Sequence, residues 1–323
     1  MIHDEKKDTM AELKLFYHKD GIVRLSRSLD FLKSNPINSF LWIDLCDVDE
    51  EVENELEDFL KIYIQEEEEM IEIEMSSRYI ETNDTLVVNS NFLLSNFETD
   101  PVSFILKNNI LVTVRSEELI SFHETVKKIS ANPKNYPTGA HVMVALLETR
   151  VEFDADMIEN MTQKITQLSN TLTLQGANVE LLSEIKNLQE KTMLLRENII
   201  DKQRTVSSML RSEFLSAELQ PKLSIIIKDI NSLVEHIKFS FDRLDYLQDT
   251  FLGYVNIEQN KIIKIFTIVS VIFMPPTLIA SIYGMNFRIM PELNSKWGYP
   301  IALLLMVLSS LFILYFFKKK KWL

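Results

Sequence analysis

An apolar stretch near the C-terminus, residues 262–287, limits what this chain can fold into more than any other feature. Its central part, 265–283, carries no charge and as a helix would span about 28 Å, close to the hydrocarbon thickness of a bilayer. A second apolar run follows after a short polar break. A soluble helical hairpin is the alternative, but two such runs in succession favour two transmembrane helices, at about 263–283 and 298–317.

Positive charges flank the two apolar runs. Lys261 and Lys264 precede the first run and a basic tail, 318–323, follows the second, whereas the loop between them, 284–297, has few charges. The positive-inside rule places both termini in the cytoplasm and the loop outside. We therefore expect a multi-pass protein of the inner (plasma) membrane that contacts lipid and has no cleavable signal. Glu292 in the outer loop would concentrate cations locally, or is an ordinary loop charge.

The composition argues against several classes of function. A net charge of −13 disfavours nucleic acid as a partner, since phosphate binding needs a basic surface. The single cysteine, Cys46, rules out an internal disulfide and is expected to fill a core position in a reducing compartment. The chain has no G-x-x-x-x-G-K-[ST] segment, so ATP is not expected as a partner. Its five scattered histidines form no catalytic motif, and we expect no enzyme.

Residues 1–135 are expected to form a mixed α/β domain in the cytoplasm. A helix is predicted over 52–63, where apolar residues recur one turn apart. The segments 85–97 and 102–116 each contain two strand candidates, with a turn in the middle of the second. A further helix is expected to open with Ser116 as its N-cap.

The next part of the chain is predicted to be helical. Residues 136–217 carry apolar repeats of spacing three and four on both sides of Gly176, which predicts an antiparallel coiled-coil arm. Asp154 interrupts the first repeat. The arm is either structural or a surface for a partner. Residues 218–261 are expected to be a cytoplasmic stalk that continues into a membrane domain, 262–323.

One face of the first apolar run is polar. The proline-free segment 223–274 predicts a single helix of about 50 residues, about 75 Å long, that joins the stalk rigidly to the membrane. Projected on a helix, one arc of about 100° holds a stripe of hydroxyl, amide and apolar side chains. Its members are Asn260, Ile263, Thr267, Ser270, Met274, Thr277 and Ser281. Such a stripe either packs helices together or, repeated around a symmetry axis, lines a pore, which would require a cyclic oligomer.

A sequence signature follows this stripe. The first apolar run ends in Tyr-Gly-Met-Asn-Phe at 283–287, Met-Pro-Glu-Leu follows at 290–293, and Trp-Gly-Tyr-Pro follows at 297–300. With a last apolar run and a basic C-terminus after it, the Gly-Met-Asn triplet resembles that of the CorA family of magnesium channels. The detailed resemblance covers residues 255–323, and Trp-Ile-Asp-Leu at 42–45 is the one recognisable fragment elsewhere.

The resemblance implies a funnel-shaped homopentamer. Each subunit would have an α+β cytoplasmic domain, an all-α stalk helix that lines a central pore, and a two-helix transmembrane anchor. Met274, Thr277 and Asn286 match pore positions of the family, and Phe266 lies on the same line, where relatives usually have an aliphatic residue. Ile263 and Met274 would be apolar constrictions that gate by dewetting.

The resemblance also implies the cargo, which is Mg²⁺, with Co²⁺ or Ni²⁺ as further cations. A dication that enters along a potential of 100 mV gains about 4.6 kcal/mol, so no other energy source is needed. Gly284, Met285 and Asn286 would form the selectivity site, where amide and backbone carbonyl oxygens accept hydrogen bonds from the waters of a hydrated ion. Gly284 would let the backbone approach closely or turn with positive φ. A plain helix C-cap is the alternative role of Asn286.

In the family, cytoplasmic Mg²⁺ also binds between subunits and closes the pore. Asp229 and Asp249 on the long helix, with Glu98 and Asp100 on the opposing side, are the candidate regulatory ligands, and solvated surface charge is the alternative for each. Two rival functions remain. A zinc-transporting branch of the superfamily shares the triplet, although the chain lacks a rich set of histidines and cysteines. A membrane-anchored coiled-coil scaffold would conduct nothing.

Overall fold

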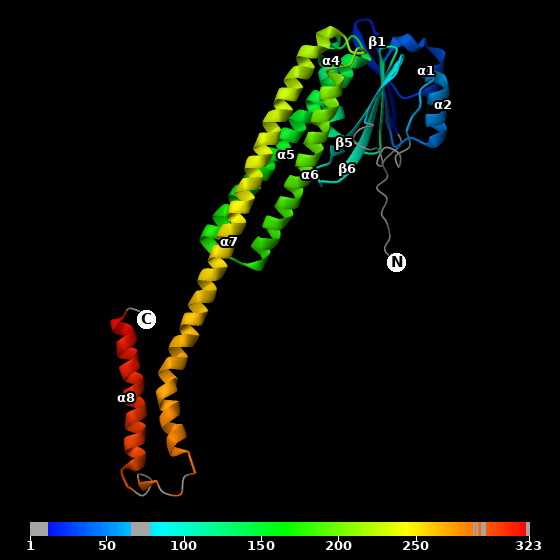
Figure 1. Cartoon of the computed structure of the whole chain (residues 1–323). Helices are drawn as coiled ribbons and strands as arrows, with labels where there is room; N and C mark the ends of the chain where they lie inside the picture. Colours follow the sequence, from blue (N-terminus) through cyan, green and yellow to red (C-terminus); the bar gives the residue numbers. More distant parts are fainter. Residues whose placement is uncertain (1–11, 66–77, 287, 289, 292–294, 321–323) are drawn as a thin grey trace. The chain divides into compact units, whose positions relative to one another are not determined.

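The computed structural model describes residues 12–65, 78–286, 288, 290–291 and 295–320. The chain divides into two compact units, which are Met1–Gln248 and Asp249–Leu323. The first unit holds a β-sheet with helices on both faces, and the second holds two long apolar helices (Figure 1). The expected fold class, an α+β part with a long helix and two candidate membrane spans, is confirmed.

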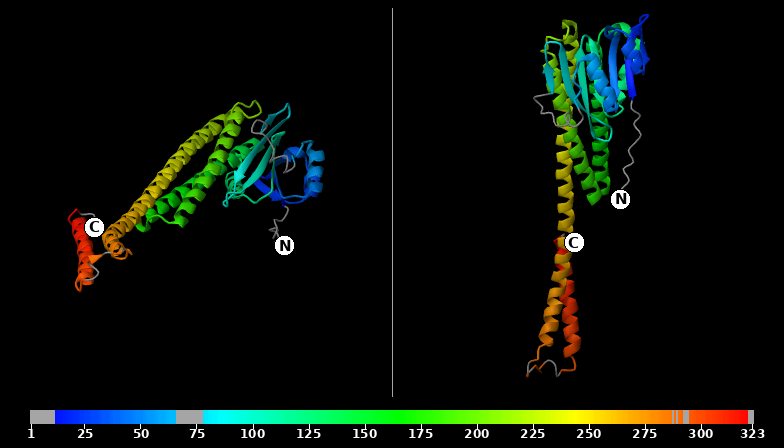
Figure 2. Two further views of the ribbon diagram at one scale, coloured as in Figure 1. Left: turned by 60° about the horizontal axis from the view of Figure 1, so that its bottom comes forward. Right: turned by 90° about the vertical axis from the view of Figure 1, so that its right-hand side faces the viewer.

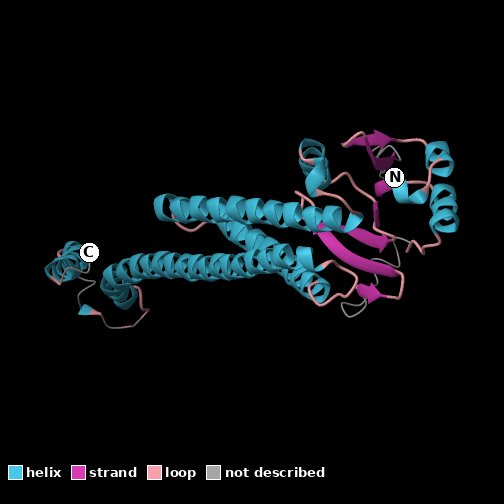
Figure 3. Ribbon diagram, turned by 90° about the horizontal axis from the view of Figure 1, so that it is seen from above, coloured by secondary structure: helices cyan, strands magenta, loops and turns pink. Residues whose placement is uncertain are grey.

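The sheet of the first unit has seven strands in the order β2-β1-β3-β7-β6-β5-β4. The strands are β1 Glu12–Lys19, β2 Ile22–Ser26, β3 Phe40–Cys46, β4 Tyr79–Glu81, β5 Thr85–Leu93, β6 Thr99–Lys107 and β7 Ile110–Arg115. β3 and β7 run parallel, and every other neighbouring pair is antiparallel. Both central strands are buried along their whole length, because helices cover both faces of the sheet (Figure 3).

Two short helices cover one face of the sheet. They are α1, Leu29–Ser34, and α2, Glu50–Leu60. Leu32 and Leu56 are fully buried there in one apolar cluster with side chains from the central strands. The helix predicted over 52–63 is thus present, but it starts two residues earlier and ends where Lys61 turns into the left-handed region (φ 50°).

Three longer helices cover the other face, with α7 beside them (Figure 2). They are α4 Ile120–Ala131, α5 Gly139–Gln175 and α6 Val179–Met209, and three short 3-10 helices, Ile37–Ser39, Pro133–Asn135 and Ala217–Leu219, join elements. α5 starts hard against β7, since a Cβ on Gly139 would lie 2.2 Å from the backbone nitrogen of Leu111. Only glycine fits this contact, which fixes where the long helical hairpin leaves the sheet.

The Trp-Ile-Asp-Leu fragment forms a buried polar network within β3 and β7. The indole of Trp42 donates to Thr113 Oγ1 at 2.8 Å, and this hydroxyl donates to Asp44 Oδ1 at 2.8 Å. Arg115 closes the network with two hydrogen bonds to the carboxylate of Asp44. The guanidinium also donates to Cys46 Sγ, a buried thiol whose pKa burial raises to about 12. Cys46 therefore fills the core, as predicted, and is not a reactive thiol.

Two local predictions are wrong. The helix expected to open at Ser116 begins at Ile120, because Arg115 donates to the carbonyl of Glu117 and holds this segment outside helical geometry. The segment 85–97 forms one strand, β5, and not two. It ends in a turn closed by a 2.8 Å hydrogen bond from the Leu94 amide to the Glu98 carbonyl. The turn predicted in the segment 102–116 is present between β6 and β7.

The interruption of the apolar repeat at Asp154 has a structural explanation. Asp154 on α5 is fully buried and accepts a hydrogen bond from Lys202 of α6 at 2.7 Å and another from Arg150 at 2.5 Å. Both cations lie over the ring of Phe92 in β5. Burial, with the nearby charge of Arg150, lowers the pKa of Lys202 to about 7. Asp154 of α5 and Lys202 of α6 therefore satisfy each other inside the protein.

The long helix α7, Gln220–Tyr283, has 64 residues and is longer than the predicted segment 223–274. In the first unit one side of α7 is buried, and polar contacts join the helix to α5 and α6. The buried apolar residues recur at helical spacing at Leu223, Ile226, Ile230, Ile237, Leu244 and Leu247. The helix continues through Pro275 and Pro276, as the predicted span 263–283 requires.

In the second unit, α8, Gly298–Lys319, accompanies the last part of α7. Both helices are long and apolar enough to cross a membrane. Because Pro276 has no N–H, the carbonyl of Ile272 loses its helical donor. The hydroxyl of Ser310 on α8 donates to this carbonyl over 3.4 Å, a long hydrogen bond that replaces the missing one. This exchange helps the helix to tolerate Pro276.

Candidate ion pathway

The predicted stripe lies on one side of α7 in the second unit. The partly buried residues of this stretch recur at helical spacing at 268, 271, 272, 275, 276, 279 and 283. They define the face of α7 that packs within the unit, and Ile272 on this face accepts the hydrogen bond from α8. At 100° per residue the stripe is centred about 150° away from this face. The packing alternative for the stripe therefore cannot be satisfied by α8.

All eight candidate lining residues have exposed side chains in the single chain. They are Asn260, Ile263, Phe266, Thr267, Ser270, Met274, Thr277 and Ser281. The side chains of the apolar members are mostly exposed, with Ile263 62%, Phe266 68% and Met274 65% exposed. Large apolar groups that are this exposed require a covering of lipid or of other copies of the helix.

The two threonines of the stripe have a defined hydroxyl orientation. Thr267 donates to the carbonyl of Ile263 and Thr277 donates to the carbonyl of Phe273, both at 2.8 Å. Each hydroxyl proton is therefore used inside the helix, which leaves the oxygen lone pairs directed away from it. Oxygens of this kind present hydrogen-bond acceptors, the groups that the waters around a cation need.

The Gly-Met-Asn triplet lies where α7 ends. The amide of Gly284 donates to the carbonyl of Ala280 at 2.9 Å, and a Cβ at Gly284 would lie 3.1 Å from the same oxygen. Gly284 does not have positive φ, so of the two roles expected for this glycine the structure shows the close backbone approach. Met285 and Asn286 follow with exposed side chains. Asn286 is not among the described residues with positive φ, the backbone geometry of a left-handed helix C-cap.

Glu292 lies outside the described residues, as do Phe287 and part of the Met-Pro-Glu-Leu segment. The predicted role of Glu292 in concentrating cations therefore stays a prediction.

The four candidate regulatory carboxylates differ in position. Asp229, Asp249 and Glu98 are exposed, whereas Asp100 is only 3% exposed. Burial raises the pKa of Asp100 to about 7, and the backbone amide of Ser116 partly offsets this by donating to Oδ1 at 3.3 Å. Within the described part of the chain, no three histidine, cysteine or carboxylate side chains form a metal cluster.

Comparison with known proteins identifies the family. The model of the CorA-like Mg²⁺ transporter protein family matches residues 38–319. The magnesium transport protein CorA of Wolinella succinogenes is 39% identical over 320 residues, which cover 96% of this chain and 100% of that protein. The magnesium transport protein CorA of Escherichia coli K12 is 35% identical over 309 residues, which cover 93% of this chain and 97% of that protein.

A solved structure shows the same fold over the whole length. The complete structure of the CorA magnesium transporter from Methanocaldococcus jannaschii covers 100% of both chains with a TM-score of 0.82 at 21% sequence identity. At this identity the likeness concerns the fold alone, while the family assignment rests on the sequence matches. This chain is a member of the CorA-like Mg²⁺ transporter family.

Proposed function

We propose that the chain is the subunit of a divalent cation channel that takes up Mg²⁺, and also accepts Co²⁺ or Ni²⁺, along the membrane potential. One observation carries the proposal: the polar stripe of α7 lies opposite the face that packs within the second unit. Since one helix cannot enclose water, several copies of α7 must surround an axis for these side chains to line a path. The names of the relatives, which are magnesium transport proteins, support the same cargo.

The assembly we propose is a funnel-shaped homopentamer in the inner membrane. α7 and α8 would be the two spans, with both termini in the cytoplasm and the loop 284–297 outside, because lysines gather at the ends away from the loop. Entry of a dication at 100 mV releases about 4.6 kcal/mol, which makes ATP unnecessary as an energy source.

Selection would take place at the ring of Asn286 side chains. Mg²⁺ sheds its waters reluctantly, so a site for rapid conduction must hold the hydrated ion through weak contacts. Amide oxygens of Asn286 and backbone carbonyls near Gly284 accept hydrogen bonds from these waters without the tight binding of a carboxylate ring. Farther along the path, the outward oxygens of Thr277 and Thr267 would continue the same contacts.

Closure would use the apolar members of the stripe. Ile263, Phe266 and Met274, exposed in the single chain, would meet their copies around the axis and expel water from the path. Phe266 lies about 60° from the centre of the stripe by helical spacing, so it would close the path only if its ring turns inward.

Regulation by cytoplasmic Mg²⁺ is proposed to use carboxylates of neighbouring copies. Asp229 and Asp249 on α7 and Glu98 at the β5–β6 turn have the exposure that such a bridge needs. Asp100 would first have to leave its buried position. Protection of the first unit from protease at millimolar Mg²⁺ would test this bridge, and unchanged cleavage would contradict it.

The transport proposal is tested by flux into proteoliposomes that contain the full chain. We expect Mg²⁺ uptake that depends on an inside-negative potential and is lost in Asn286→Ala, while the control Asn135→Ala, an exposed asparagine of the first unit, keeps it. A panel of Mg²⁺, Co²⁺, Ni²⁺ and Zn²⁺ separates the zinc-transporting alternative. Wild-type Mg²⁺ flux through Asn286→Ala would contradict the selectivity site, and absence of flux from wild type would favour a scaffold.

A further inference from the structure

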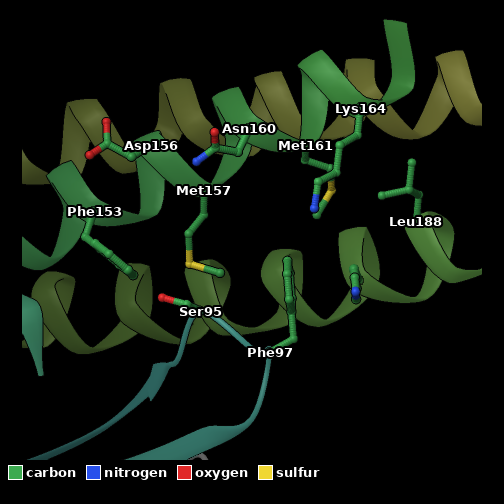
Figure 4. Close-up of a pocket in the computed structure, with 10 residues that line it drawn as sticks. Ser95, Phe97, Phe153, Asp156, Met157, Asn160, Met161, Lys164 and Leu188 are labelled. Carbon is green, nitrogen blue, oxygen red and sulfur yellow. The ribbon is translucent and has the colours of Figure 1, made fainter. Parts of the chain in front are cut away.

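The first unit contains a cavity that the proposed transport does not use. It has a volume of about 290 Å³ and lies between the β5–β6 turn and the helices α5 and α6 (Figure 4). Met157, Met161 and Leu188 are buried and form an apolar floor. A second cavity of about 360 Å³ shares Lys164, Leu188 and Lys191 with the first and continues between the two helices. Together they reach the size of pockets that hold small organic molecules.

The wall of this cavity contains a strained aromatic residue. Phe97 has φ of 70°, a left-handed conformation that a bulky side chain adopts rarely. The turn holds it there, since the Phe97 amide donates to the carbonyl of Leu94 at 3.0 Å. Figure 4 shows its ring pointing from the turn toward α5, with the side chain of Met157 pointing toward it. The turn therefore places the flat face of the Phe97 ring at the cavity.

Charge is distributed unequally along the cavity. Lys164 and Lys191 lie at one end, and the ammonium of Lys191 is 5.2 Å from the centre of the Phe97 ring. Lys186 on α6 is paired with Glu190, whereas no described carboxylate lies within 4.0 Å of either cavity lysine. Asp156 lies toward the other end of the cavity, and Asn160 lies between Asp156 and Lys164 (Figure 4). Glu184 lines the second cavity. The two cavities together thus offer two cations, an apolar floor with an aromatic wall, and Asp156 as an acceptor for an amino group.

We propose that this cavity binds a nucleoside phosphate. The base would lie on the methionine floor beside Phe97, with its exocyclic amino group near Asp156 and Asn160, and the phosphate would be held by Lys164 and Lys191. Lysine is a regular phosphate ligand, and thioethers adapt to flat rings. The lack of a glycine-rich phosphate loop in the sequence does not bear on this site, because here side chains hold the phosphate. Binding, and not hydrolysis, is what the residues support.

The test uses the full chain in detergent with ADP as the probe and EDTA present, so that Mg²⁺ binding does not contribute. Isothermal titration should show saturable ADP binding with Kd at or below about 1 mM. We expect Lys191→Gln to weaken binding about tenfold and the more exposed Lys164→Gln about threefold, because each loses a charge-assisted contact. Lys186→Gln, on the same helix but outside the cavity, is the matched control and should bind ADP like wild type.

Two further probes test the phosphate end and the base end of the cavity separately. Inorganic phosphate and adenosine at equal concentration should each bind at least about tenfold more weakly than ADP, since each meets only one end of the cavity. Thermal unfolding of each variant, monitored without ligand, confirms that the fold is intact. Absence of ADP binding, equal binding of inorganic phosphate and ADP, or unchanged ADP affinity in the double variant Lys164→Gln/Lys191→Gln would each overturn the proposal. None of these outcomes depends on whether the chain transports Mg²⁺.

Discussion

Polar residues within apolar helices are placed differently in the helical hairpin of the first unit and in the polar stripe of α7. In the hairpin, Asp154 and Lys202 interrupt two apolar repeats, and the chain itself pairs them in a fully buried contact. On α7, polar residues interrupt an apolar run on the side away from the intraunit packing, and their side chains are exposed. A polar residue that is paired within the chain stabilises the fold. A polar residue without such a partner indicates that it interacts with something outside the chain.

The largest effect expected from this comparison is the loss of stability on removing Asp154. Asp154→Ala would remove the carboxylate that the buried side chains of Arg150 and Lys202 share, and would leave Arg150 as a buried charge without its partner. We expect the free energy of unfolding of the first unit to fall by about 3–5 kcal/mol. Chemical denaturation of the full chain, followed by circular dichroism, measures it. The exposed Glu159→Ala on the same helix is the control, and similar losses in both variants would remove the distinction.

A smaller effect concerns pH and the buried Asp100. Its folded pKa of about 7 lies above the unfolded value, so its contribution to stability is full below about pH 4 and disappears as pH rises through 7. We expect this group to lower stability by about 2 kcal/mol between pH 5 and pH 7. Unfolding midpoints of wild type and Asp100→Asn at both pH values measure it, because the variant should lack this fall. An equal pH dependence in the two proteins would show that Asp100 is ionised at pH 5.

The smallest effect expected is a reduction of transport that leaves the stability of the first unit unchanged. Thr277→Val keeps the shape of the side chain but removes the oxygen whose lone pairs face away from α7. We expect Mg²⁺ flux to fall about fivefold, equivalent to one weak hydrogen bond of about 1 kcal/mol, with the unfolding of the first unit unchanged. Radiotracer or fluorescent flux into proteoliposomes measures it, with Ile265→Val, which lies outside the stripe, as the control. Equal flux in both variants would place Thr277 against lipid or protein.

Much of the second unit could be predicted because its signals are local. A span needs only enough apolar residues in a row, and the stripe follows from helical spacing, so 263–283 and 298–317 lie within helices α7 and α8. The predicted span 263–283 runs through Pro275 and Pro276, but the hydrogen bond that Ser310 of α8 donates to the carbonyl of Ile272 could not be predicted, since it joins two helices. The β1–β2 hairpin was not predicted either, although its Asp20-Gly21 turn, with positive φ at both residues, has a recognisable sequence signal.

The sequence by itself determined the two apolar spans, the polar face of the long helix and the signature that marks the family, because each depends on residues that are neighbours along the chain or one helical turn apart. Only the tertiary structure decided that Asp154 pairs with Lys202, that Asp100 is buried, and that Phe97 is held in a left-handed turn beside the two cavity lysines. These contacts depend on which elements, distant in sequence, pack together in the first unit. The packing of the sheet and helices decides this, and residue spacing along the chain does not reveal it.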